Sequence, residues 1–456
     1  MDGTVGSETI EKVNNATHVN GAAARAVLNG IARARRTPDE TPTQFHIITF
    51  EGPDPYSRAG GIASRVSGLT EALAAGGFDT HLWFVGDPGL PGHETRDQLH
   101  LHRWCQWISQ YHPGGVYDGE EGKRADLAAS LPPFLAQEVL LPHLRRGGRS
   151  VVLAEEWHTA EAVLHLDWLL RREGLRERAA ILWNANNVFG FDRINWQAIE
   201  RAATVTTVSR YMKHLMRGLG VDPVVIPNGL AADAFERPEP GAVAELARRL
   251  QDRLAFTKIA RWDPDKGWLS AVAIVRELKR RGLRPLLIAR GGVESHGGEV
   301  LAAAAAAGLR VSERAHKRPG AWGTLEALGD LDHVDVVSLR SPVDSDSRRV
   351  LLHASTAVLA NSRHEPFGLV GLETMAAGGL ACTGCSGEDY AVQGQNAVVL
   401  QTEDPREFVG AMHRLRANPR EERALRRAGR ATARRYAWPQ IVKRLLLPRL
   451  QLLGAN

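Results

Sequence analysis

The sequence predicts an α/β protein with two domains of similar size, each built around a mostly parallel β-sheet. Three observations support this prediction. The 456 residues are too many for one ordinary hydrophobic core. Short apolar or β-branched runs alternate with longer Ala-, Leu- and Arg-rich helical patterns, as in strand–helix–strand units. This alternation stops after Asn228-Gly229 and resumes near residue 254, which indicates a boundary between two domains.

The first series of elements begins at Phe45. An apolar run over residues 45–50 predicts a strand, and the pattern over residues 62–75 predicts a helix. The further strands expected in this domain are 80–85, 150–154, 180–183, 204–208 and 224–226. Residues 85–149 contain many turn residues, and we predict no element there. Six tryptophans of this domain are each expected in the core, with stacking on an acceptor as the alternative: Trp104, Trp107, Trp157, Trp168, Trp183 and Trp196.

The second series of elements follows the boundary. Its expected strands are 254–259, 285–289, 334–339, 356–360 and 397–400. The predicted domains are therefore residues 44–230 and 253–430, joined by a linker over 231–252 that contains a polar helix. Residues 1–43 contain no Phe, Trp or Tyr and are expected to form a flexible arm.

Composition excludes several classes of protein. The net charge of +5, from 57 basic and 52 acidic residues, is small for this length and does not predict a nucleic-acid partner. Three cysteines cannot form a disulfide framework, and no apolar run approaches the ~20 residues that span a bilayer. The N-terminus lacks an apolar signal segment, so we expect a cytoplasmic protein. The Arg-rich residues 414–449 leave peripheral membrane contact open, although a solvated helix face explains them too. The oligomeric state is not predicted.

Two loops that follow expected strands carry groups suited to phosphate. In parallel α/β sheets, ligands bind at the carboxyl ends of the strands. The loop after the first strand contains Gly60-Gly61 and leads into a helix whose free amides suit a phosphate; a plain tight turn is the alternative. The loop after the first strand of the second domain contains Arg261 and Lys266, which can converge on one diphosphate. A surface loop of mixed charge is the alternative there.

The most specific motif is E-P-F-G-L-V-G-L-E at residues 365–373. It follows the expected strand 356–360, so Glu365 should lie in the loop, Gly368 at the helix start, and Glu373 one to two turns into the helix. Each carboxylate can accept from two hydroxyl groups, which suits a sugar. An acidic helix start is the alternative, but it does not explain the Pro-Phe-Gly entry.

This motif resembles the E-x(7)-E signature of the family 4 retaining glycosyltransferases (glycosyl transferases group 1), which have the GT-B fold. Further motifs in the same order resemble the family: the Gly60-Gly61 loop, E-E-W-H-T-A at 155–160, V-I-P-N-G at 225–229 and R-Y-A-W at 435–438. The resemblance covers about residues 45–440. It implies two facing Rossmann-like domains with an interdomain cleft, and a C-terminal crossover helix over residues 431–456 that returns to the first domain.

The resemblance also implies roles for individual residues. Arg261 and Lys266 would hold the donor diphosphate and stabilise the leaving group. Glu365 would contact the hydroxyls of the transferred sugar, Glu373 would bind the ribose, and His158 would contact the sugar from the first domain. The implied catalytic residues are Glu365, Arg261, Lys266 and His158. The backbone amides implied to complete the phosphate site belong to Gly60, Gly61, Phe367, Gly368 and Leu369.

The implied reaction is sugar transfer with retention from a nucleoside diphosphate-sugar, bound by the second domain, to a hydroxyl acceptor. The acceptor is a glycan, a small molecule or a lipid, on the side of the first domain. The nucleotide-sugar is a co-substrate, and no cofactor is expected. No metal is expected either, because Arg261 and Lys266 neutralise the leaving group. The D-x-D pairs at Asp263 and Asp344 are weak metal candidates, and the C-x-x-C at Cys382 has no second ligand pair.

Other functions stay open at this point. A phosphorylase or an NDP-sugar epimerase also uses two Rossmann-like domains, although no signature of a pyridoxal lysine is present and the spacing of Glu365 and Glu373 favours a transferase. A sugar-nucleotide-binding protein without catalysis is a second alternative. The sequence does not predict the donor base, the donor sugar or the acceptor.

Overall fold

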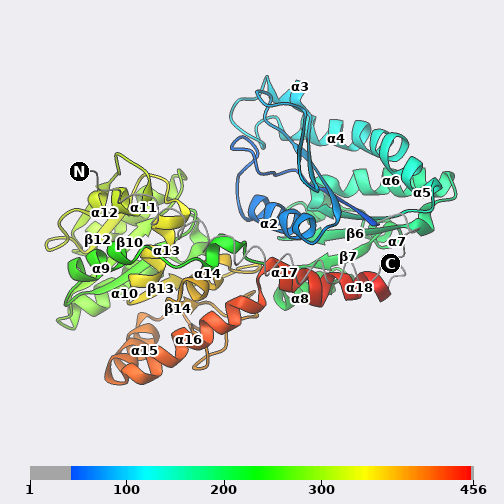
Figure 1. Cartoon of the computed structure of the whole chain (residues 1–456). Helices are drawn as coiled ribbons and strands as arrows, with labels where there is room; N and C mark the ends of the chain where they lie inside the picture. Colours follow the sequence, from blue (N-terminus) through cyan, green and yellow to red (C-terminus); the bar gives the residue numbers. More distant parts are fainter. Residues whose placement is uncertain (1–42, 453–456) are drawn as a thin grey trace, which may run out of the picture. The chain divides into compact units, whose positions relative to one another are not determined.

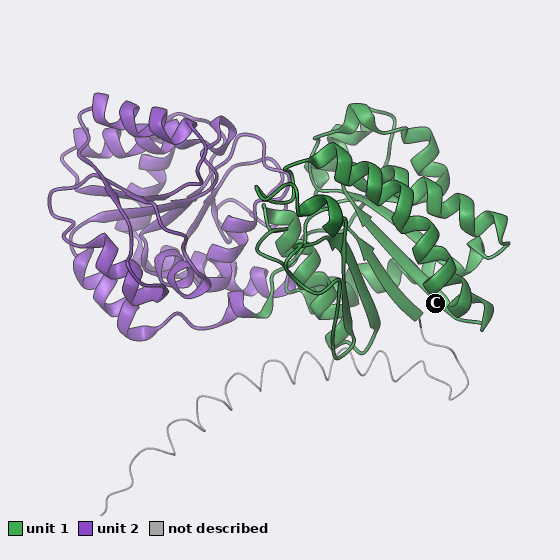
Figure 2. Cartoon of the chain, turned by 90° about the horizontal axis from the view of Figure 1, so that it is seen from above, with its two compact units in different colours: residues 1–232, 437–456 green, residues 233–436 purple. Residues whose placement is uncertain are grey.

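The structure is a computed structural model that describes residues 43–452. The chain divides into two compact units: residues 1–232 together with 437–456 form unit 1, and residues 233–436 form unit 2 (Figures 1 and 2). The expected arm lies outside the described residues, except for Thr43. Each unit contains one sheet with helices on its faces, so the predicted fold class is confirmed.

Unit 1 contains an eight-stranded sheet in the order β3-β4-β2-β1-β5-β6-β7-β8. All neighbouring strands are parallel except β3 and β4, which are antiparallel. The strands are β1 (Thr43–Ile48), β2 (Asp79–Val85), β3 (His93–Arg96), β4 (Leu99–Trp104), β5 (Arg149–Glu155), β6 (Ala179–Ala185), β7 (Thr204–Thr207) and β8 (Val224–Val225). The central strands β1, β5 and β6 are almost completely buried, as expected when helices cover both faces of a parallel sheet.

The helices of unit 1 follow the strands along the chain. They are α2 (Gly61–Ala75), α3 (Gln106–Ser109), α4 (Glu120–Phe134), α5 (Leu141–Arg145), α6 (Ala160–Arg172), α7 (Trp196–Ala202), α8 (Arg210–Arg217), α17 (Trp438–Ile441) and α18 (Leu447–Leu452). Single π-helical segments continue α4 (Leu135–Leu140) and join α17 to α18 (Val442–Leu446). Trp183 is fully buried, as predicted. The core prediction was wrong for Trp107 and Trp168, whose side chains are more than half exposed on helices α3 and α6.

Unit 2 contains a seven-stranded sheet in the order β11-β12-β10-β9-β13-β14-β15, with parallel neighbours throughout. The strands are β9 (Leu254–Ile259), β10 (Pro285–Arg290), β11 (Val311–Arg314), β12 (Val336–Leu339), β13 (Ala357–Ala360), β14 (Ala381–Thr383) and β15 (Val398–Val399). The helices are α9 (Pro240–Arg249), α10 (Trp268–Arg280), α11 (His296–Ala306), α12 (Gly320–Leu328), α13 (Ser345–Ala354), α14 (Leu369–Ala377), α15 (Pro405–Ala417) and α16 (Pro419–Arg435).

Both sheets have a topological switch point, where the chain leaves a central strand toward opposite edges. In unit 1 this point lies between β1 and β5, and in unit 2 it lies between β9 and β13. The loops that follow these four strands contain Gly60-Gly61, residues 156–158, residues 261–266 and residues 361–368. A crevice outside the carboxyl ends of the strands at such a point is where open α/β sheets bind ligands. The fold therefore places the Gly60-Gly61 loop, the E-E-W-H segment, the loop of Arg261 and Lys266 and the start of the E-x(7)-E motif at two switch points.

Two segments differ from the simple expectation. Within residues 231–252, α9 buries Ala242 and Leu246 in the core that α12 and α13 share, so this helix packs as part of unit 2. Residues 85–149, for which no element was predicted, contain β3, β4 and helices α3 to α5. Strand β4 is hard to recognise because its alternate residues are His100, His102 and Trp104 rather than simple polar side chains.

The C-terminal segment from Ala437 onward belongs to unit 1. Trp438 is 1% exposed, and its backbone amide donates to the carbonyl of Leu230 at 3.1 Å. Its indole lies directly against Gly68 of α2 and against Gly229, so close that a Cβ at either glycine would stand within 2.5 Å of the ring. The two glycines thus make room for this side chain. A helix over residues 431–456 was expected, whereas α16 ends at Arg435 in unit 2 and the segment that belongs to unit 1 begins at Ala437.

Candidate functional site

The loop after β9 is shaped by its own side chains. Asp263 caps the short helical turn Pro264–Lys266 by accepting from the amide of Asp265 at 2.8 Å. Gly267 then adopts φ +67°, and a Cβ at this position would stand 2.4 Å from the carbonyl oxygen of Asn361. Glycine is needed here because the backbone is left-handed and passes close to the neighbouring loop. The turn therefore fixes the direction in which Lys266 leaves the loop, and the D-x-D at Asp263 serves as a helix cap.

Lys266 and Glu365 form an ion pair across the switch point of unit 2. The ammonium nitrogen of Lys266 donates to Oε2 of Glu365 at 2.7 Å, and each side chain is about one-fifth exposed (18% and 19%). The two loops are also joined through the backbone, because the amide of Arg363 donates to the carbonyl of Asp265 at 2.8 Å. The structure thus brings together two of the predicted catalytic residues, which are 99 positions apart in sequence.

Beneath Lys266, the neighbouring lysine Lys258 is fully buried in β9. Its ammonium group donates to the carbonyl of Leu359 at 3.0 Å and to Oδ1 of Asn361 at 3.1 Å. Burial, reinforced by the charge of Lys266, lowers the pKa of Lys258 to about 7. This side chain ties β9 to the end of β13 and so supports the loop from which Glu365 projects.

The loop after β13 enters helix α14 through a glycine. Gly368 has φ +75° and precedes the first helical residue, Leu369. The hydroxyl of Tyr390 donates to the Gly368 carbonyl, which fixes the turn. The amide of Glu365 donates to the hydroxyl of Ser386 at 2.9 Å, and Gly387 packs against the carbonyls of Glu365 and Pro366. The Pro-Phe-Gly entry therefore sets a backbone path, as the sequence indicates, and leaves the first amides of α14 at the carboxyl edge of the sheet.

Glu388 lies beside this entry as a buried carboxyl group. It is 5% exposed, its Oε2 accepts from the amide of Ser386 at 3.2 Å, and its Oε1 has no hydrogen-bond partner among residues 43–452. Burial, with the charge of Glu365 as the second cause, raises the pKa of Glu388 to about 8. The group is therefore protonated at neutral pH and adds no second negative charge next to Glu365.

We expect the Glu388→Gln variant to lose a pH dependence that the wild-type protein has. Between the ordinary pKa of 4.5 and the folded value of about 8, the folded chain keeps a proton that the unfolded chain releases. The wild-type free energy of unfolding therefore falls as pH rises through this window and levels off above it. Glutamine cannot ionise, so relative to wild type the variant should gain about 2–4 kcal/mol between pH 5 and pH 8.5.

Urea unfolding at several pH values measures this difference, with Glu200→Gln, an exposed position, as the control. If the free energies of unfolding of wild type and Glu388→Gln differ by the same amount from pH 5 to pH 8.5, Glu388 is ionised in the folded chain at neutral pH.

Glu373 lies on helix α14, one turn beyond its start, and has a different partner. Nη1 of Arg348, on α13, donates to both carboxylate oxygens of Glu373 at 2.9 and 3.1 Å. The neighbouring D-x-D is again a cap, since Asp344 accepts from the amides of Ser347 and Gly320 at 2.8 and 2.6 Å. Glu365 and Glu373 therefore stand at the same edge of the sheet, each held by its own cation.

Arg261 projects from the end of the β9 loop and is exposed. Its guanidinium forms no hydrogen bond or ion pair with any residue from 43 to 452, whereas its carbonyl accepts from the indole of Trp268 at 2.7 Å. An unpaired guanidinium two residues after a buried strand is free to meet an anion. The structure does not pair Arg261 with Lys266 or Glu365.

In unit 1, the glycine loop is closed by a carboxylate of the same chain. Oε2 of Glu51 accepts from the amides of Gly60 at 2.9 Å and of Ala63 at 3.0 Å. Oε1 of Glu51 accepts from the hydroxyl of Tyr117 at 2.7 Å. These amides form the N-terminus of α2, and an anion there is favoured by the helix dipole. Gly60 and Gly61 themselves are exposed.

His158 lies at the other side of the unit 1 switch point, after β5. Its ring stacks on Phe50, with centroids 4.3 Å apart, and on Trp157, with centroids 4.1 Å apart. Its Nε2 lies 2.7 Å from a carboxylate oxygen of Glu120, and its buried Nδ1 has no partner within the described part of the chain. Burial lowers the pKa of His158, against the opposing effect of Glu120, so the imidazole is held neutral.

Glu155 and Glu156, which precede Trp157 and His158, are both buried and have different hydrogen-bond partners. Glu155 accepts from Nε of Arg65 at 3.0 Å, and Arg65 in turn donates to Oδ1 of Asn228 in the V-I-P-N-G motif at 2.8 Å. Glu156 has φ +69° and accepts from the amide of Asn186 at 2.6 Å. Burial raises the pKa of Glu156 to about 8. The E-E-W-H segment is thus anchored by Glu155, which pairs with Arg65, and by Glu156, whose carboxyl group is protonated at neutral pH because of burial.

Several residues that line these loops were not identified from the sequence as site residues. They are Glu51, Glu120, Lys258, Arg348 and Glu388. Glu51 could have been found, because it directly follows the first strand at the expected carboxyl edge. Arg348 could not have been found in this way, because its pairing with Glu373 depends on the packing of two helices.

Comparisons with known proteins agree with this architecture. Residues 325–432 match the model of the family "Glycosyl transferases group 1". The chain is 28% identical over 371 residues to a D-inositol 3-phosphate glycosyltransferase of Thermobispora bispora, covering 74% of this chain and 80% of that protein. No helix within residues 43–452 has the length and apolar character needed to cross a membrane.

Three solved structures that share the fold each match 91% of this chain. A sucrose-phosphate synthase of Thermosynechococcus elongatus gives a TM-score of 0.62 at 20% identity, over 91% of this chain and 100% of that chain. An α,α-trehalose 6-phosphate synthase of Burkholderia multivorans gives a TM-score of 0.61 at 14% identity, over 91% of this chain and 97% of that chain. Anabaena HepE in complex with UDP and glucose gives 0.57 at 12% identity, over 91% and 100%. These similarities establish the GT-B fold.

Proposed function

We propose that the chain is a group 1 glycosyltransferase that transfers a sugar, with retention, from a nucleoside diphosphate-sugar to a hydroxyl acceptor, since residues 325–432 match the model of that family and the fold is GT-B. The observation that carries this proposal is the Lys266–Glu365 pair, 2.7 Å apart at the switch point of unit 2, with the unpaired guanidinium of Arg261 on the same loop. Anabaena HepE, which has the same fold, binds UDP and glucose, and this is consistent with such a donor.

The proposed reaction needs no nucleophile from the protein. The bond between the anomeric carbon and the diphosphate oxygen breaks, and the acceptor oxygen bonds to the same face of that carbon. The acceptor's proton passes to the departing phosphate oxygen. Arg261 and Lys266 stabilise the negative charge that develops on the diphosphate, which is the main electrostatic demand of the step. Two fixed cations of the chain supply the charge that a metal ion supplies in other phosphate-transfer sites, so the proposed step is metal-independent.

The remaining residues have positioning roles in this proposal. Glu365 accepts hydrogen bonds from hydroxyls of the donor sugar while Lys266 keeps the carboxylate oriented. Glu373, held by Arg348, accepts from the ribose hydroxyls. The amides at Gly368 and Leu369 bind the phosphates at the N-terminus of α14. In unit 1, the loops of Gly60-Gly61 and of His158 follow the neighbouring strands β1 and β5 and form the proposed binding surface for the acceptor.

Donor turnover tests the proposal. The protein is incubated with UDP-, ADP- and GDP-sugars in the presence of EDTA, and release of the nucleoside diphosphate is followed without an added acceptor. We expect slow hydrolysis of one donor that survives EDTA and falls at least ~100-fold in Glu365→Ala, because the sugar loses its hydroxyl contacts. Glu200→Ala, at an exposed position on α7 of unit 1, is the control and should keep wild-type turnover.

The outcomes separate the alternatives. A donor that binds but is not consumed even with a panel of glycan, small-molecule and lipid acceptors would favour the sugar-nucleotide-binding protein. Conversion of a donor to its epimer without release of a nucleoside diphosphate would favour the epimerase.

A further inference from the structure

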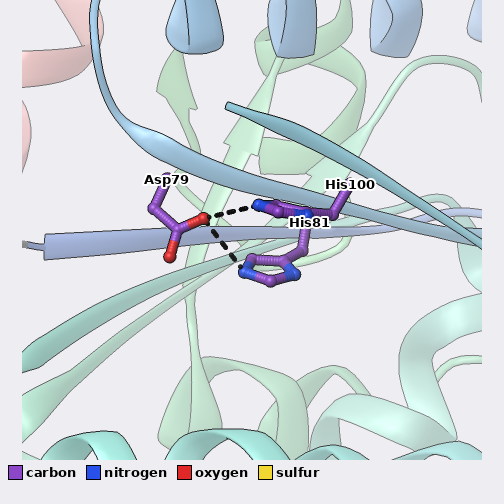
Figure 3. A group of neighbouring side chains, drawn as sticks. All are labelled: Asp79, His81 and His100. Carbon is purple, nitrogen blue, oxygen red and sulfur yellow. Dashed lines mark ion pairs between the residues drawn. The ribbon is translucent and has the colours of Figure 1, made fainter. Parts of the chain in front are cut away.

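Unit 1 carries a cluster of histidines that the proposed transfer reaction does not use. Strands β2, β3 and β4 place His81, His93, His100 and His102 on the same face of the sheet, together with Asp79 and Thr95 (Figure 3 shows the central three). The register explains the cluster: His81 pairs with His100, and His102 pairs with His93. Residues two apart on a strand share a face, so H-x-H in β4 and D-x-H in β2 lie side by side.

The centre of the cluster has the geometry of a metal site. Oδ1 of Asp79 lies 3.0 Å from Nε2 of His100 and 3.4 Å from Nε2 of His81, and all three atoms lie within 4.8 Å of one another. Two ligands of a tetrahedral Zn²⁺, each about 2.0–2.2 Å from the ion, stand about 3.3–3.5 Å apart. In Figure 3 the two rings direct their Nε2 atoms at the same carboxylate oxygen. Nε2 of His81 is buried and makes no hydrogen bond with the described residues.

The side chains of the cluster form a closed ring of polar contacts, and one of these contacts has no hydrogen atom with which to form a hydrogen bond. From Asp79 the ring runs through His81, His102, His93, Thr95 and His100, and back to Asp79. Its contacts are 3.4 Å (Asp79–His81), 3.0 Å (His81–His102), 3.2 Å (His102–His93), 3.2 Å (His93–Thr95), 3.1 Å (Thr95–His100) and 3.0 Å (His100–Asp79). A neutral histidine and a threonine each bring one hydrogen to the ring, and an ionised aspartate brings none. Four histidines and one threonine thus leave one of the six contacts without a hydrogen.

A divalent cation between Asp79, His81 and His100 removes this deficit. With both Nε2 atoms on the metal, the Nδ1–H of His81 donates to His102, and His102 donates to His93. The Nε2–H of His93 and the Nδ1–H of His100 both donate to the hydroxyl oxygen of Thr95. Every remaining contact then contains one hydrogen, and each metal-bound imidazole donates its other nitrogen to a polar partner, as metal-ligating histidines do.

Other features around Asp79 suit a bound cation. Nε2 of Gln44 donates to Oδ2 of Asp79 at 2.8 Å, which orients the carboxylate and leaves Oδ1 for the metal. The side chains of Asp79 and His100 are 28% and 23% exposed, so water can supply the fourth ligand.

We propose that Asp79, His81 and His100 form a structural site for a divalent transition-metal cation such as Zn²⁺. Two nitrogens and one carboxylate oxygen are ligands that Zn²⁺ accepts. Asp79 is the first residue of β2, and the seven residues of that strand, at ~3.3 Å each, put about 20 Å between this site and the loops at the carboxyl edge of the same sheet. The cation therefore joins β2 to β4 at the amino edge and takes no part in sugar transfer.

The test uses the full untagged chain after treatment with a chelator. Zn²⁺ alone is titrated by calorimetry, and thermal unfolding is followed with and without it. We expect one tight site per chain and a rise of about 5 °C or more in the Tm of unit 1 at saturating Zn²⁺. Donor turnover measured at low temperature should be unchanged by the chelator, which distinguishes this site from a metal needed for the reaction.

Single substitutions identify the ligands. Asp79→Asn and His100→Gln should each weaken Zn²⁺ binding at least ~100-fold and remove the rise in Tm, whereas His413→Gln, at an exposed position in α15, should behave as wild type. Because a variant can fail for loss of folding, its circular dichroism without metal is compared with that of chelated wild type. The visible absorption of bound Co²⁺ gives a second readout, expected in wild type and His413→Gln only.

Two results would overturn the proposal. The first is equal Zn²⁺ affinity in wild type and in both ligand variants when all are folded. The second is a wild-type Tm that Zn²⁺ does not change but that rises when the pH is lowered, which would show that a proton completes the ring.

Discussion

Replacing Lys266 with alanine is expected to lower kcat for donor turnover by about 10²–10³-fold, with a smaller change in KM. Lys266 is the cation nearest to Glu365, at 2.7 Å, and its position is fixed by the capped turn and by the left-handed Gly267. Without it, the departing diphosphate loses one of its two proposed cations. The Glu365 carboxylate also loses its partner and stands unpaired beside the phosphate, so transition-state charge is stabilised less.

Two further variants make this result specific. Lys266→Arg keeps the positive charge but replaces the compact ammonium group with a planar guanidinium, so it should recover part of the lost kcat. Lys317→Ala removes an exposed lysine of the same unit and should leave kcat unchanged. Steady-state release of the nucleoside diphosphate measures all three. A Lys266→Ala enzyme with wild-type kcat would mean that the leaving group departs elsewhere.

Replacing Trp438 with alanine is expected to lower the free energy of unfolding of unit 1 by about 3–5 kcal/mol. The indole is 1% exposed, fills the space left by Gly68 and Gly229, and lies under the guanidinium of Arg65 at 5.6 Å from the ring centroid. Gly68 and Gly229, which line the pocket, have no side chains that could fill the cavity. The loss would show how strongly the C-terminal segment is part of unit 1.

Trp438→Phe is the matched control. Nε1 of Trp438 is buried without a hydrogen-bond partner among residues 43–452, so phenylalanine loses volume but no hydrogen bond. Its cost should be about 1–2 kcal/mol. Urea unfolding followed by circular dichroism measures both variants. A cost below about 1 kcal/mol for Trp438→Ala would contradict a packed C-terminal segment.

The fold could be predicted from the sequence wherever apolar runs were short and continuous. Strand β9 was predicted at its observed bounds, and β1, β5, β6 and β13 were predicted within two residues. The prediction failed between residues 85 and 149 because polar histidines alternate with apolar residues in β4. Helix α9 was predicted as polar, and its buried Ala242 and Leu246 show that a narrow apolar stripe is enough to dock it.

The candidate site was predictable at the level of loops but not of contacts. The sequence places Lys266 and Glu365 after two different strands, and the order of strands in the sheet makes those strands neighbours. The partner of Glu373 could not be inferred, because Arg348 reaches it from another helix. Glu51 was also missed, although its place directly after the first strand indicates the carboxyl edge; its contact with the amide of Gly60 is visible only in the folded chain.

The histidine cluster was missed for a related reason. His100 and His102 alternate in a strand that was not recognised, and Asp79 and His81 lie at the start of a strand whose expected bounds excluded Asp79. A period-two pattern of histidines is a signal that sequence analysis could use, because it predicts imidazoles on one face of a sheet. The pairing of β2 with β4 is the information that only the structure supplies.

The central claim is that the loop of Arg261 and Lys266 recognises the diphosphate of the donor, and one calorimetric comparison tests it most directly. Binding of the nucleoside diphosphate and of the corresponding monophosphate is measured for wild type and Lys266→Ala, with uridine, adenosine and guanosine nucleotides. We expect wild type to bind one diphosphate at least ~10-fold tighter than its monophosphate. Lys266→Ala should lose this difference while its affinity for the monophosphate is unchanged. An equal loss of affinity for both nucleotides, or no loss for either, would mean that Lys266 does not recognise the diphosphate.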